Sequence, residues 1–480
     1  MRVVAIDQGT TSTRALIIED DGSNRLLGTR RHRQILPAPG RVEHDPAELL
    51  RDVSDLVALG REAGADAAAL ANQGETVVAW DRGTGRPVCN AIVWQDQRTA
   101  ARIEALRAEG AEPEVTDRSG LPLDAYFSAS KLRWILDEVP EARQLLTAGR
   151  LGLGTSDAWF LERLTGRYAT DVTTAARTSL MNLDRCAWDP VLCEIFGVPL
   201  ESLPEIVECD ATVGELPGRL RLGAAIVDQV AALYGHGCAL PGDAKVTFGT
   251  GAFALAVTEG RARIPGVVAA LGWRGPHGRV HAADGGVYSA GAAVEWLLRL
   301  RLLDDLGQLD ALACPPAAAS GVFFVPALSG LACPHWDRSA TGLWIGLDAA
   351  TGREQLVKAV LEGVAFRVAE VLDALGAEAR GVLSIDGGLS RSGYFRSFLA
   401  SILGRELFLP ATDEVTALGA ARLAVRAGGA PPGTRIAPEA GNARWREAFA
   451  EARRRSMGWR GLSPQAKVGA SASKSCRYRW

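Results

Sequence analysis

The stretch from Val3 to Ile18 reads VVAIDQGTTSTRALII, two apolar strands joined by a turn rich in glycine and threonine. Gly9 can adopt backbone angles that other residues avoid, so the amides and hydroxyls of the turn can converge on anionic oxygens. The candidate phosphate ligands are Thr10, Thr11, Ser12 and Arg14. Asp7 would repel a bare phosphate, and its position at the end of the first strand therefore indicates a bridging Mg2+. The turn predicts a nucleotide site, although the string alone fits a plain hairpin equally well.

The same pattern returns in the second half of the chain. Val246-Thr-Phe248 leads into Gly249-Thr250-Gly251, and another apolar run follows at 252–257. Two matching hairpins imply two similar domains, each of which offers a phosphate-binding loop to a shared cleft. A chain of 480 residues also exceeds what one core normally supports. We expect an N-terminal domain at 1–237, a C-terminal domain at 238–459 and a loose tail at 460–480 without an assigned function.

Composition narrows the classes of partner. The net charge of -3 gives no general attraction to nucleic acid, and the Lys and Arg residues are scattered along the chain. No segment resembles a signal peptide or approaches the roughly 20 apolar residues that span a bilayer. The eight cysteines form no Cys-x-x-Cys pair, which indicates reduced thiols and not a zinc site. We therefore expect a cytoplasmic enzyme without a nucleic-acid or membrane partner.

Strand and helix signals alternate along both halves, which is typical of an α/β fold. Asp45-Pro46 is a helix start with Asp45 as the N-cap, and apolar residues follow it at helical spacing. The stretch 65–72 predicts a buried strand whose carboxyl end delivers the next residues to a cleft. The string SIDGG at 384–388 predicts a strand that opens into a helix and directs backbone amides toward a ligand. A further helix is expected at 413–424.

Two better-known nucleotide motifs were weighed against this interpretation. The chain has no Gly-x4-Gly-Lys-Ser/Thr string, which excludes a P-loop protein. The string GTGAFA at 249–254 fits the Gly-x-Gly-x-x-Ala pattern of dinucleotide-binding folds. However, the residues that follow continue as a strand where such a fold needs a helix. A nicotinamide oxidoreductase is therefore the weaker interpretation.

Several long strings carry a resemblance to a known family. They are AIDQGTTSTR at 5–14, NAIVWQ at 90–95, YFS at 126–128, GTG at 249–251 and EVTALGAA at 414–421. From about Val3 to about Trp459 the chain resembles the FGGY carbohydrate kinases, and within them most closely the glycerol kinases. The resemblance implies two RNase H-like domains of the actin and hexokinase (ASKHA) type. It also implies ATP and Mg2+ in the interdomain cleft, and phosphoryl transfer to a hydroxyl of a small polyol or sugar.

The resemblance assigns roles on the donor side. Asp7 matches the metal-associated aspartate, and Asp228 matches the catalytic aspartate of a Gly-Asp-Gln motif and a second metal ligand, although Val227 replaces the glycine. An attacking alcohol needs such a base within hydrogen-bond reach. Thr10, Thr11, Ser12, Arg14, Thr250 and Gly251 are expected to contact phosphate, and Gly291, Glu295, Gly387, Gly388 and Ser392 the rest of the nucleotide. Ser392 and Glu295 differ from the amides common in glycerol kinases, which leaves the adenine contacts open.

The acceptor side departs from the closest relatives. The matching acceptor positions are Gly74, Glu75, Trp94, Tyr126, Asp228, Gln229 and Phe253. Glycerol kinases present Arg-Glu where this chain has Gly74-Glu75, so a cation that would bind polyol hydroxyls is missing. Loss of a buried donor can shift selectivity by orders of magnitude. Two alternatives stay open: an arginine from elsewhere replaces the lost side chain, and Trp94 and Tyr126 serve ordinary core packing.

Function beyond the kinase class is left open in three respects. The acceptor could be erythritol, xylulose or ribulose instead of glycerol. The alternative to an enzyme is a sensing protein that has the same fold but has lost catalysis. The stretch 219–224 lacks the clustered glycines that bind fructose 1,6-bisphosphate in many bacterial glycerol kinases, so we predict no inhibition by this compound. A homodimer is compatible with the sequence but is not predicted by it.

Overall fold

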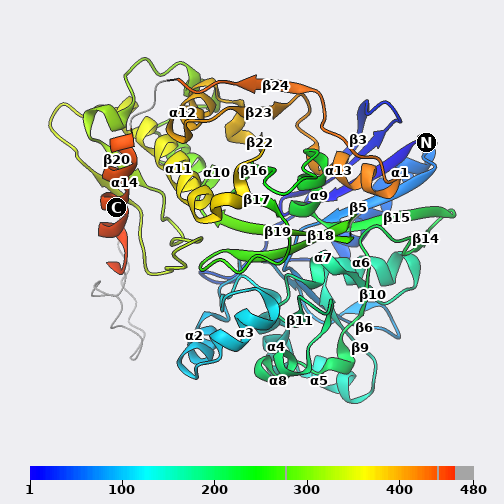
Figure 1. Ribbon diagram of the computed structural model, residues 1–480. Helices are drawn as coiled ribbons and strands as arrows, with labels where there is room; N and C mark the ends of the chain where they lie inside the picture. The colour runs from blue at the N-terminus through cyan, green and yellow to red at the C-terminus, as the bar shows by residue number, and fades with distance from the viewer. Residues whose placement is uncertain (276–277, 440–442, 460–480) are drawn as a thin grey trace, which may run out of the picture.

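The computed structural model describes residues 1–275, 278–439 and 443–459, and it contains two large mixed sheets (Figure 1). The first sheet belongs to the N-terminal half, defined as the residues before 238, and has the strand order β14-β15-β5-β1-β2-β3. Its strands are β1 (Val3–Gln8), β2 (Ser12–Ile18), β3 (Asn24–Arg31), β5 (Ala67–Asn72), β14 (Gly214–Leu216) and β15 (Leu220–Val227). β1 pairs antiparallel with β2 and parallel with β5, which in turn pairs parallel with β15.

The second sheet belongs to the C-terminal half and has the order β18-β19-β17-β16-β22-β23-β24. Its strands are β16 (Ala244–Phe248), β17 (Ala252–Thr258), β18 (Val268–Gly275), β19 (Gly278–Val287), β22 (Leu383–Gly387), β23 (Leu407–Pro410) and β24 (Gly433–Ile436). β16 pairs antiparallel with β17 and parallel with β22, so the arrangement around β1 is repeated around β16. Both predicted hairpins are therefore confirmed.

The first hairpin turn is tighter than the sequence predicts. β2 begins at Ser12, because Thr13 and Arg14 already pair with Gln8 and Asp7 in the ladder. Residues that were expected in the turn thus lie in a strand. Because successive side chains of a strand point to opposite faces of the sheet, only every second one of these residues can direct its side chain toward the cleft.

Helices cover both faces of the first sheet. α1 (Pro46–Glu62) packs on one face, and its N-cap Asp45 accepts a hydrogen bond from the Ala47 amide at 2.9 Å, as the sequence predicts. The other face is covered by α9 (Asp228–Gly235) and by α13 (Val415–Ala424), which comes from the C-terminal half. The predicted helix at 413–424 is thus present but begins two residues later. Figure 1 shows α13 beside the strands of the N-terminal sheet.

α9 and α13 approach each other closely because glycine lies at their contact. A Cβ atom on Gly419 would lie 1.8 Å from the carbonyl oxygen of Ala231, and one on Gly235 would lie 2.1 Å from that of Val415. The apolar core around these helices also includes Leu255 of the second sheet. The helix pair therefore joins the cores of the two halves.

The remaining elements form outer layers. In the N-terminal half they include a small sheet with β4 (Glu43–His44), β6 (Val77–Asp81), β7 (Arg86–Pro87), β8 (Ala91–Ile92) and β9 (Leu151–Thr155). The helices of these layers are α2 (Ala100–Ala108), α3 (Glu112–Ser119), α4 (Ser128–Glu138), α5 (Pro140–Thr147), α6 (Ser156–Thr165), α7 (Val172–Ala175) and α8 (Pro190–Phe196). In the C-terminal half they include α10 (Gly291–Arg299), α11 (Arg353–Leu375), α12 (Gly393–Leu403), α14 (Ala443–Ser456), β20 (Phe323–Val325) and β21 (Leu343–Ile345). Two short strand pairs complete the N-terminal half: β10 (Ala169–Asp171) with β13 (Glu205–Val207), and β11 (Met181–Asn182) with β12 (Ala187–Trp188).

Two sequence expectations can be compared with the described ranges. Within them, no helix is both long and apolar enough to cross a membrane. All cysteines in the same ranges are free thiols, as predicted. Cys476 and the predicted loose tail at 460–480 lie outside the described residues.

Candidate active site

A cavity of about 210 Å3 lies where the two glycine hairpins face each other. The first half contributes Thr10, Thr11, Gly74, Glu75, Trp94, Tyr126, Thr173, Arg177, Val227, Asp228, Gln229 and Val230, and the second Thr247, Gly249, Thr250, Gly251, Phe253, Leu255, Ala270 and Asp284. Strand register explains the convergence in the first half, because the ends of β1, β5 and β15 lie level, with Asn72 paired to both Gln8 and Val227. The carboxyl ends of these strands therefore present Asp7, Glu75 and Asp228 at one edge.

The first hairpin is held in shape by its own backbone and by neighbours. The Gly9 amide donates to the carbonyl of Ser12 at 3.0 Å, which closes the turn. The Trp94 indole Nε1 donates to the Thr10 hydroxyl at 2.9 Å. Arg14, however, is paired with both carboxylate oxygens of Glu414, at 3.0 and 3.2 Å. Its predicted phosphate contact would therefore compete with this ion pair.

The second hairpin is packed against the start of α10. The amide of Gly291 donates to the carbonyl of Gly249 at 3.0 Å, and a Cβ on Gly291 would lie only 2.5 Å from that oxygen. A Cβ on Gly251 would likewise lie 2.7 Å from the carbonyl oxygen of Val287. Glycine is required at both positions because backbones touch there. Glu295, one turn further along α10, is exposed.

β22 ends in Asp386 and Gly387, close to the predicted strand end, but a short 3-10 turn at Gly388–Arg391 separates the strand from α12. Gly387 has a φ of 89°, and a Cβ on it would lie 2.3 Å from the carbonyl oxygen of Phe248. Ser392 is the N-cap of α12 and donates its hydroxyl to Asp310 at 2.7 Å. Gly387, Gly388 and Ser392, like Gly291 and Glu295, are outside the cavity lining. Their nucleotide contacts stay predictions.

Two partly buried carboxylates, Asp7 and Asp228, lie at the ends of β1 and β15, and of the two Asp228 lines the cavity whereas Asp7 lies outside its lining. Burial, together with the nearby charges of Asp7 and Glu75, raises the pKa of Asp228 to about 7. Burial and the charge of Glu414 raise the pKa of Asp7 to about 6. Oxygen ligands supplied by one or two carboxylates, together with substrate phosphates, suit Mg2+. The pair Asp7 and Asp228 fits such an ion, although the described residues contain no group of three or more potential ligands.

Lys245 on β16 was not predicted from the sequence. It is fully buried, donates to the side-chain oxygen of Gln229 and donates to the Thr247 hydroxyl at 3.0 Å. Its positive charge lowers the pKa of Asp228, opposing the effect of burial. Gln229, predicted to bind acceptor, thus also links the two halves through Lys245.

Three aromatic side chains form one wall of the cavity. The ring centroids of Trp94 and Tyr126 lie 5.5 Å apart, and those of Trp94 and Phe253 lie 6.2 Å apart, in edge-to-face contacts. All three rings line the cavity. The same three side chains therefore both pack against one another and line the cavity.

Gly74 lies next to two side chains whose proximity could not be predicted from the sequence. A Cβ on Gly74 would lie 3.0 Å from Val227 Cγ2 and 3.9 Å from Arg177 Cγ. Arg177, which follows α7, donates from Nε to Glu75 at 2.5 Å. The structure thus brings an arginine from elsewhere in the sequence to the cavity beside Gly74. Glu75 itself has a φ of 58°, an uncommon conformation for a non-glycine residue that often marks functional sites.

Arg177, Thr173 and Asp284 are pocket residues that sequence reasoning missed. Arg177 and Thr173 lie around a helix of only four residues, which leaves no periodic signal. Asp284 lies within a strand and resembles any charged strand residue. No local pattern in the sequence marked these positions.

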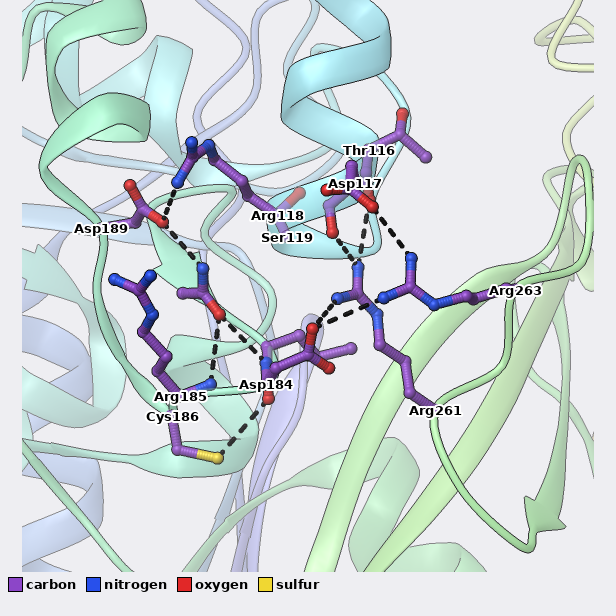
Figure 2. Close-up of polar contacts among 12 residues, drawn as sticks. Thr116, Asp117, Arg118, Ser119, Asp184, Arg185, Cys186, Asp189, Arg261 and Arg263 are labelled. Atoms are coloured by element: carbon purple, nitrogen blue, oxygen red, sulfur yellow. Dashed lines mark hydrogen bonds and ion pairs between the residues drawn. The ribbon is translucent and has the colours of Figure 1, made fainter.

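A larger groove, of about 620 Å3, lies outside the cleft between α3 and residues 261–267. Beside it, ion pairs join the two halves: Arg261 Nη1 lies 2.7 Å from Asp184 Oδ2, and Arg263 Nη1 lies 2.9 Å from Asp117 Oδ1. Figure 2 shows both arginines reaching toward these aspartates. None of the predicted site residues lines this groove.

Comparison with known proteins relates the cleft to a family. Residues 2–236 match the N-terminal domain, and residues 244–428 the C-terminal domain, of the FGGY family of carbohydrate kinases. A glycerol kinase from Symbiobacterium thermophilum is 43% identical over 447 residues, which covers 88% of this chain and 89% of that protein. A solved glycerol kinase from Plasmodium falciparum, with ADP, has a TM-score of 0.84 and 28% identity over 95% of this chain and 98% of its own. A solved xylulose kinase from Brucella ovis has a TM-score of 0.82 and 26% identity over 97% and 99%.

Two α/β halves with matching glycine hairpins at a shared cleft define a phosphotransferase of the actin-like class. The chain belongs to the FGGY family of carbohydrate kinases. It is an ATP-dependent kinase with an alcohol group as acceptor, and it is similar to glycerol kinases. The predicted family, fold class and enzyme class are therefore confirmed.

Proposed function

We propose that the chain transfers the γ-phosphoryl group of ATP to a hydroxyl of a small polyol, with glycerol as the first candidate. The observation that carries the proposal is the position of Asp228 in a cavity bounded by both glycine hairpins and the aromatic wall. Similarity to glycerol kinases over most of the chain supports glycerol. Erythritol, xylulose and ribulose are the alternative acceptors, because Gly74 departs from those relatives.

In the proposed reaction, the two hairpins hold the phosphates from opposite sides. Thr10, Thr11, Ser12 and Arg14 serve from one half, and Thr250 and Gly251 from the other, while Gly291, Glu295, Gly387, Gly388 and Ser392 lie toward the nucleoside. Mg2+, held by Asp7 and Asp228, would neutralise charge that the phosphate oxygens bring. The proposed domains are the predicted ones, at 1–237 and 238–459.

Asp228 acts as the general base on the attacking hydroxyl. A base works best when its pKa is close to the operating pH, and burial raises the pKa of Asp228 to about 7. Glu75 and Gln229 offer hydrogen-bond partners to the acceptor, and Trp94 and Phe253 exclude water beside them. The hydrogen bond from Trp94 to Thr10 fixes this wall against the phosphate loop.

The test is ATP consumption by the full chain with glycerol, erythritol, xylulose and ribulose. We expect turnover with at least one of them, and a loss of roughly 10^2 to 10^4 in kcat for Asp228→Asn, which should still bind ATP. Asp45→Asn is the matched control, because asparagine caps a helix as well as aspartate does and Asp45 lies outside the cleft. Near-normal turnover by Asp228→Asn would refute the assignment of the base. ATP binding without turnover on any acceptor would favour a sensor.

A further inference from the structure

Asp284 on β19 carries an unused hydrogen-bonding atom inside the acceptor cavity. The residue is 5% exposed and lines the cavity from the C-terminal half. Its Oδ2 accepts a hydrogen bond from Arg177 Nη1 at 2.7 Å. Its Oδ1 is buried, and no described residue provides a partner for it. Because buried polar atoms are nearly always paired, this oxygen calls for a donor that binds in the cavity.

Arg177 holds Asp284 in place. Its Nε donates to Glu75 and its Nη1 to Asp284, and the side chain is 9% exposed. Its Cζ also lies 5.8 Å from the Tyr126 ring centroid and 5.6 Å from that of Phe127. The guanidinium is therefore fixed between one carboxylate from each half, and its charge is already neutralised.

We propose that Asp284 binds a hydroxyl of the acceptor through Oδ1, with Arg177 as its positioning residue, and so selects neutral polyhydroxyl compounds. The assignment rests on the proposed kinase function and adds a binding residue to it. A hydroxyl group can donate to this oxygen, whereas an ionised carboxylate on the acceptor has no proton to offer.

The charge balance of the cavity supports the same selectivity. Among the described residues, the charged side chains of its lining are the carboxylates of Glu75, Asp228 and Asp284 and the guanidinium of Arg177. The buried Lys245 ammonium, which donates to the lining residue Gln229, adds a second positive charge beside them, so carboxylates still outnumber cations. Burial raises the pKa of Glu75 and of Asp228, so the cavity already resists further negative charge. An acceptor such as glycerate would place another carboxylate among these groups. Like charges in a buried site repel strongly because solvent screens them little.

The position of Asp284 also ties acceptor binding to both halves. Glu75 and Asp228 belong to the N-terminal half, whereas Asp284 belongs to the C-terminal half. An acceptor whose hydroxyls bind to all three carboxylates contacts both walls of the cleft. Binding of the acceptor then favours the arrangement in which the halves are together.

The test compares a polyol with analogues that lack one hydroxyl. The wild-type enzyme and Asp284→Ala are assayed with glycerol, 1,2-propanediol and 1,3-propanediol, or with the acceptor found in the polyol screen and its deoxy analogues. We expect Asp284→Ala to lower kcat/KM for the polyol about 10-fold or more, since a hydrogen bond to a charged group is lost. For the analogue without the bound hydroxyl, the loss is expected to be much smaller. The KM for ATP should not change.

Asp184→Asn is the matched control. Asp184 forms an ion pair of the same length between the halves, 2.7 Å to Arg261, but it lies outside the cavity (Figure 2). We expect the control to keep the polyol-to-analogue ratio of the wild type. An equal loss for polyol and analogues in Asp284→Ala would overturn the proposal, because a purely structural role lowers all substrates alike.

A second variant covers the case in which Asp284→Ala does not fold. Asp284→Asn keeps the size of the side chain, removes its charge and leaves the Arg177 guanidinium partly unpaired. We expect it to raise the ratio of glycerate to glycerol activity by about fivefold or more. An unchanged ratio, or a wild-type enzyme that uses glycerate as well as glycerol, would overturn the proposal. Failure of the wild type with every polyol would instead refute the proposed function.

Discussion

Gly74 and Val227, the two positions where the cleft departs from the family pattern, touch each other. A methyl group on residue 74 would lie 3.0 Å from Val227 Cγ2, whereas carbon atoms prefer a separation of about 3.5 to 4.0 Å. Both residues are buried; Val227 is the last residue of β15, and Gly74 follows the end of β5 by two residues at the same sheet edge. We therefore predict that Gly74→Ala and Val227→Ala are energetically coupled.

The size of the coupling follows from this contact. In Gly74→Ala, overpacking of a tight core costs about 1 to 3 kcal/mol of stability. The lower backbone entropy of the unfolded chain offsets about 0.4 to 1 kcal/mol of this cost, provided that the φ of the residue suits alanine. Gly74 is absent from the glycines with positive φ, so its backbone tolerates alanine. Val227→Ala alone removes two buried methyl groups, at about 0.8 kcal/mol each before any cavity cost. In the double variant the clash is gone, and we expect about 1 to 2 kcal/mol less destabilisation than the sum of the single variants.

Urea unfolding of the wild type, both single variants and the double variant measures this coupling. Equal slopes in all four proteins would establish that the same transition is compared. Acceptor KM is measured in parallel, because the contact borders Glu75. Additivity of the single effects within about 0.5 kcal/mol would refute the reasoning, since it would mean that the two side chains do not compete for space.

Lys131→Met removes a buried amine that lies behind the aromatic wall. Burial lowers the pKa of Lys131 to about 7 in the folded protein. Between pH 7 and about 10.5, the amine therefore carries a proton in the unfolded chain but not in the folded one. The free energy of unfolding of the wild type should therefore rise from pH 7 to pH 9 relative to that of Lys131→Met, by at most about 1.4 kcal/mol per pH unit. Urea unfolding of both proteins measures this difference, and parallel pH profiles would contradict it. Fructose 1,6-bisphosphate should leave kinase activity unchanged, because the β14–β15 turn carries Gly218 and an exposed Arg219 without further glycines. A clear fall in turnover on addition of the bisphosphate would show that another surface binds it.

Local signals in the sequence were sufficient for much of the fold. The cap at Asp45 and both glycine turns depend on residues that are neighbours along the chain, and each is present in the structure. The start of β2 was misplaced because a polar side chain such as Thr13 can occupy a buried strand position when it finds a hydrogen-bond partner, here His32 Nε2 at 3.0 Å. The residues that approach each other across the sheets could not be foreseen. Gly74 meets Val227, and Arg177 meets Asp284, only after the two halves have folded.

Arg14 illustrates a different limit. Its residue type and place next to the turn predict a phosphate contact, but its ion pair with Glu414 depends on the start of a helix far away in sequence. A sequence motif predicts which side chains are available and not which partners they already have. The same reasoning applies to Ser392, whose hydroxyl is bonded to Asp310.

The placement of α13 has a consequence for how the chain is made. The last strand of the N-terminal sheet ends at Val227, yet the helix that covers one of its faces ends at Ala424, 424 − 227 = 197 residues later. At a synthesis rate of about 5 to 20 residues per second, the ribosome needs roughly 10 to 40 s to supply that helix. During this interval the nascent N-terminal half exposes the part of this apolar sheet face that α9 does not cover. We expect it to bind holdase chaperones and to acquire protease resistance only after residue 424 has emerged.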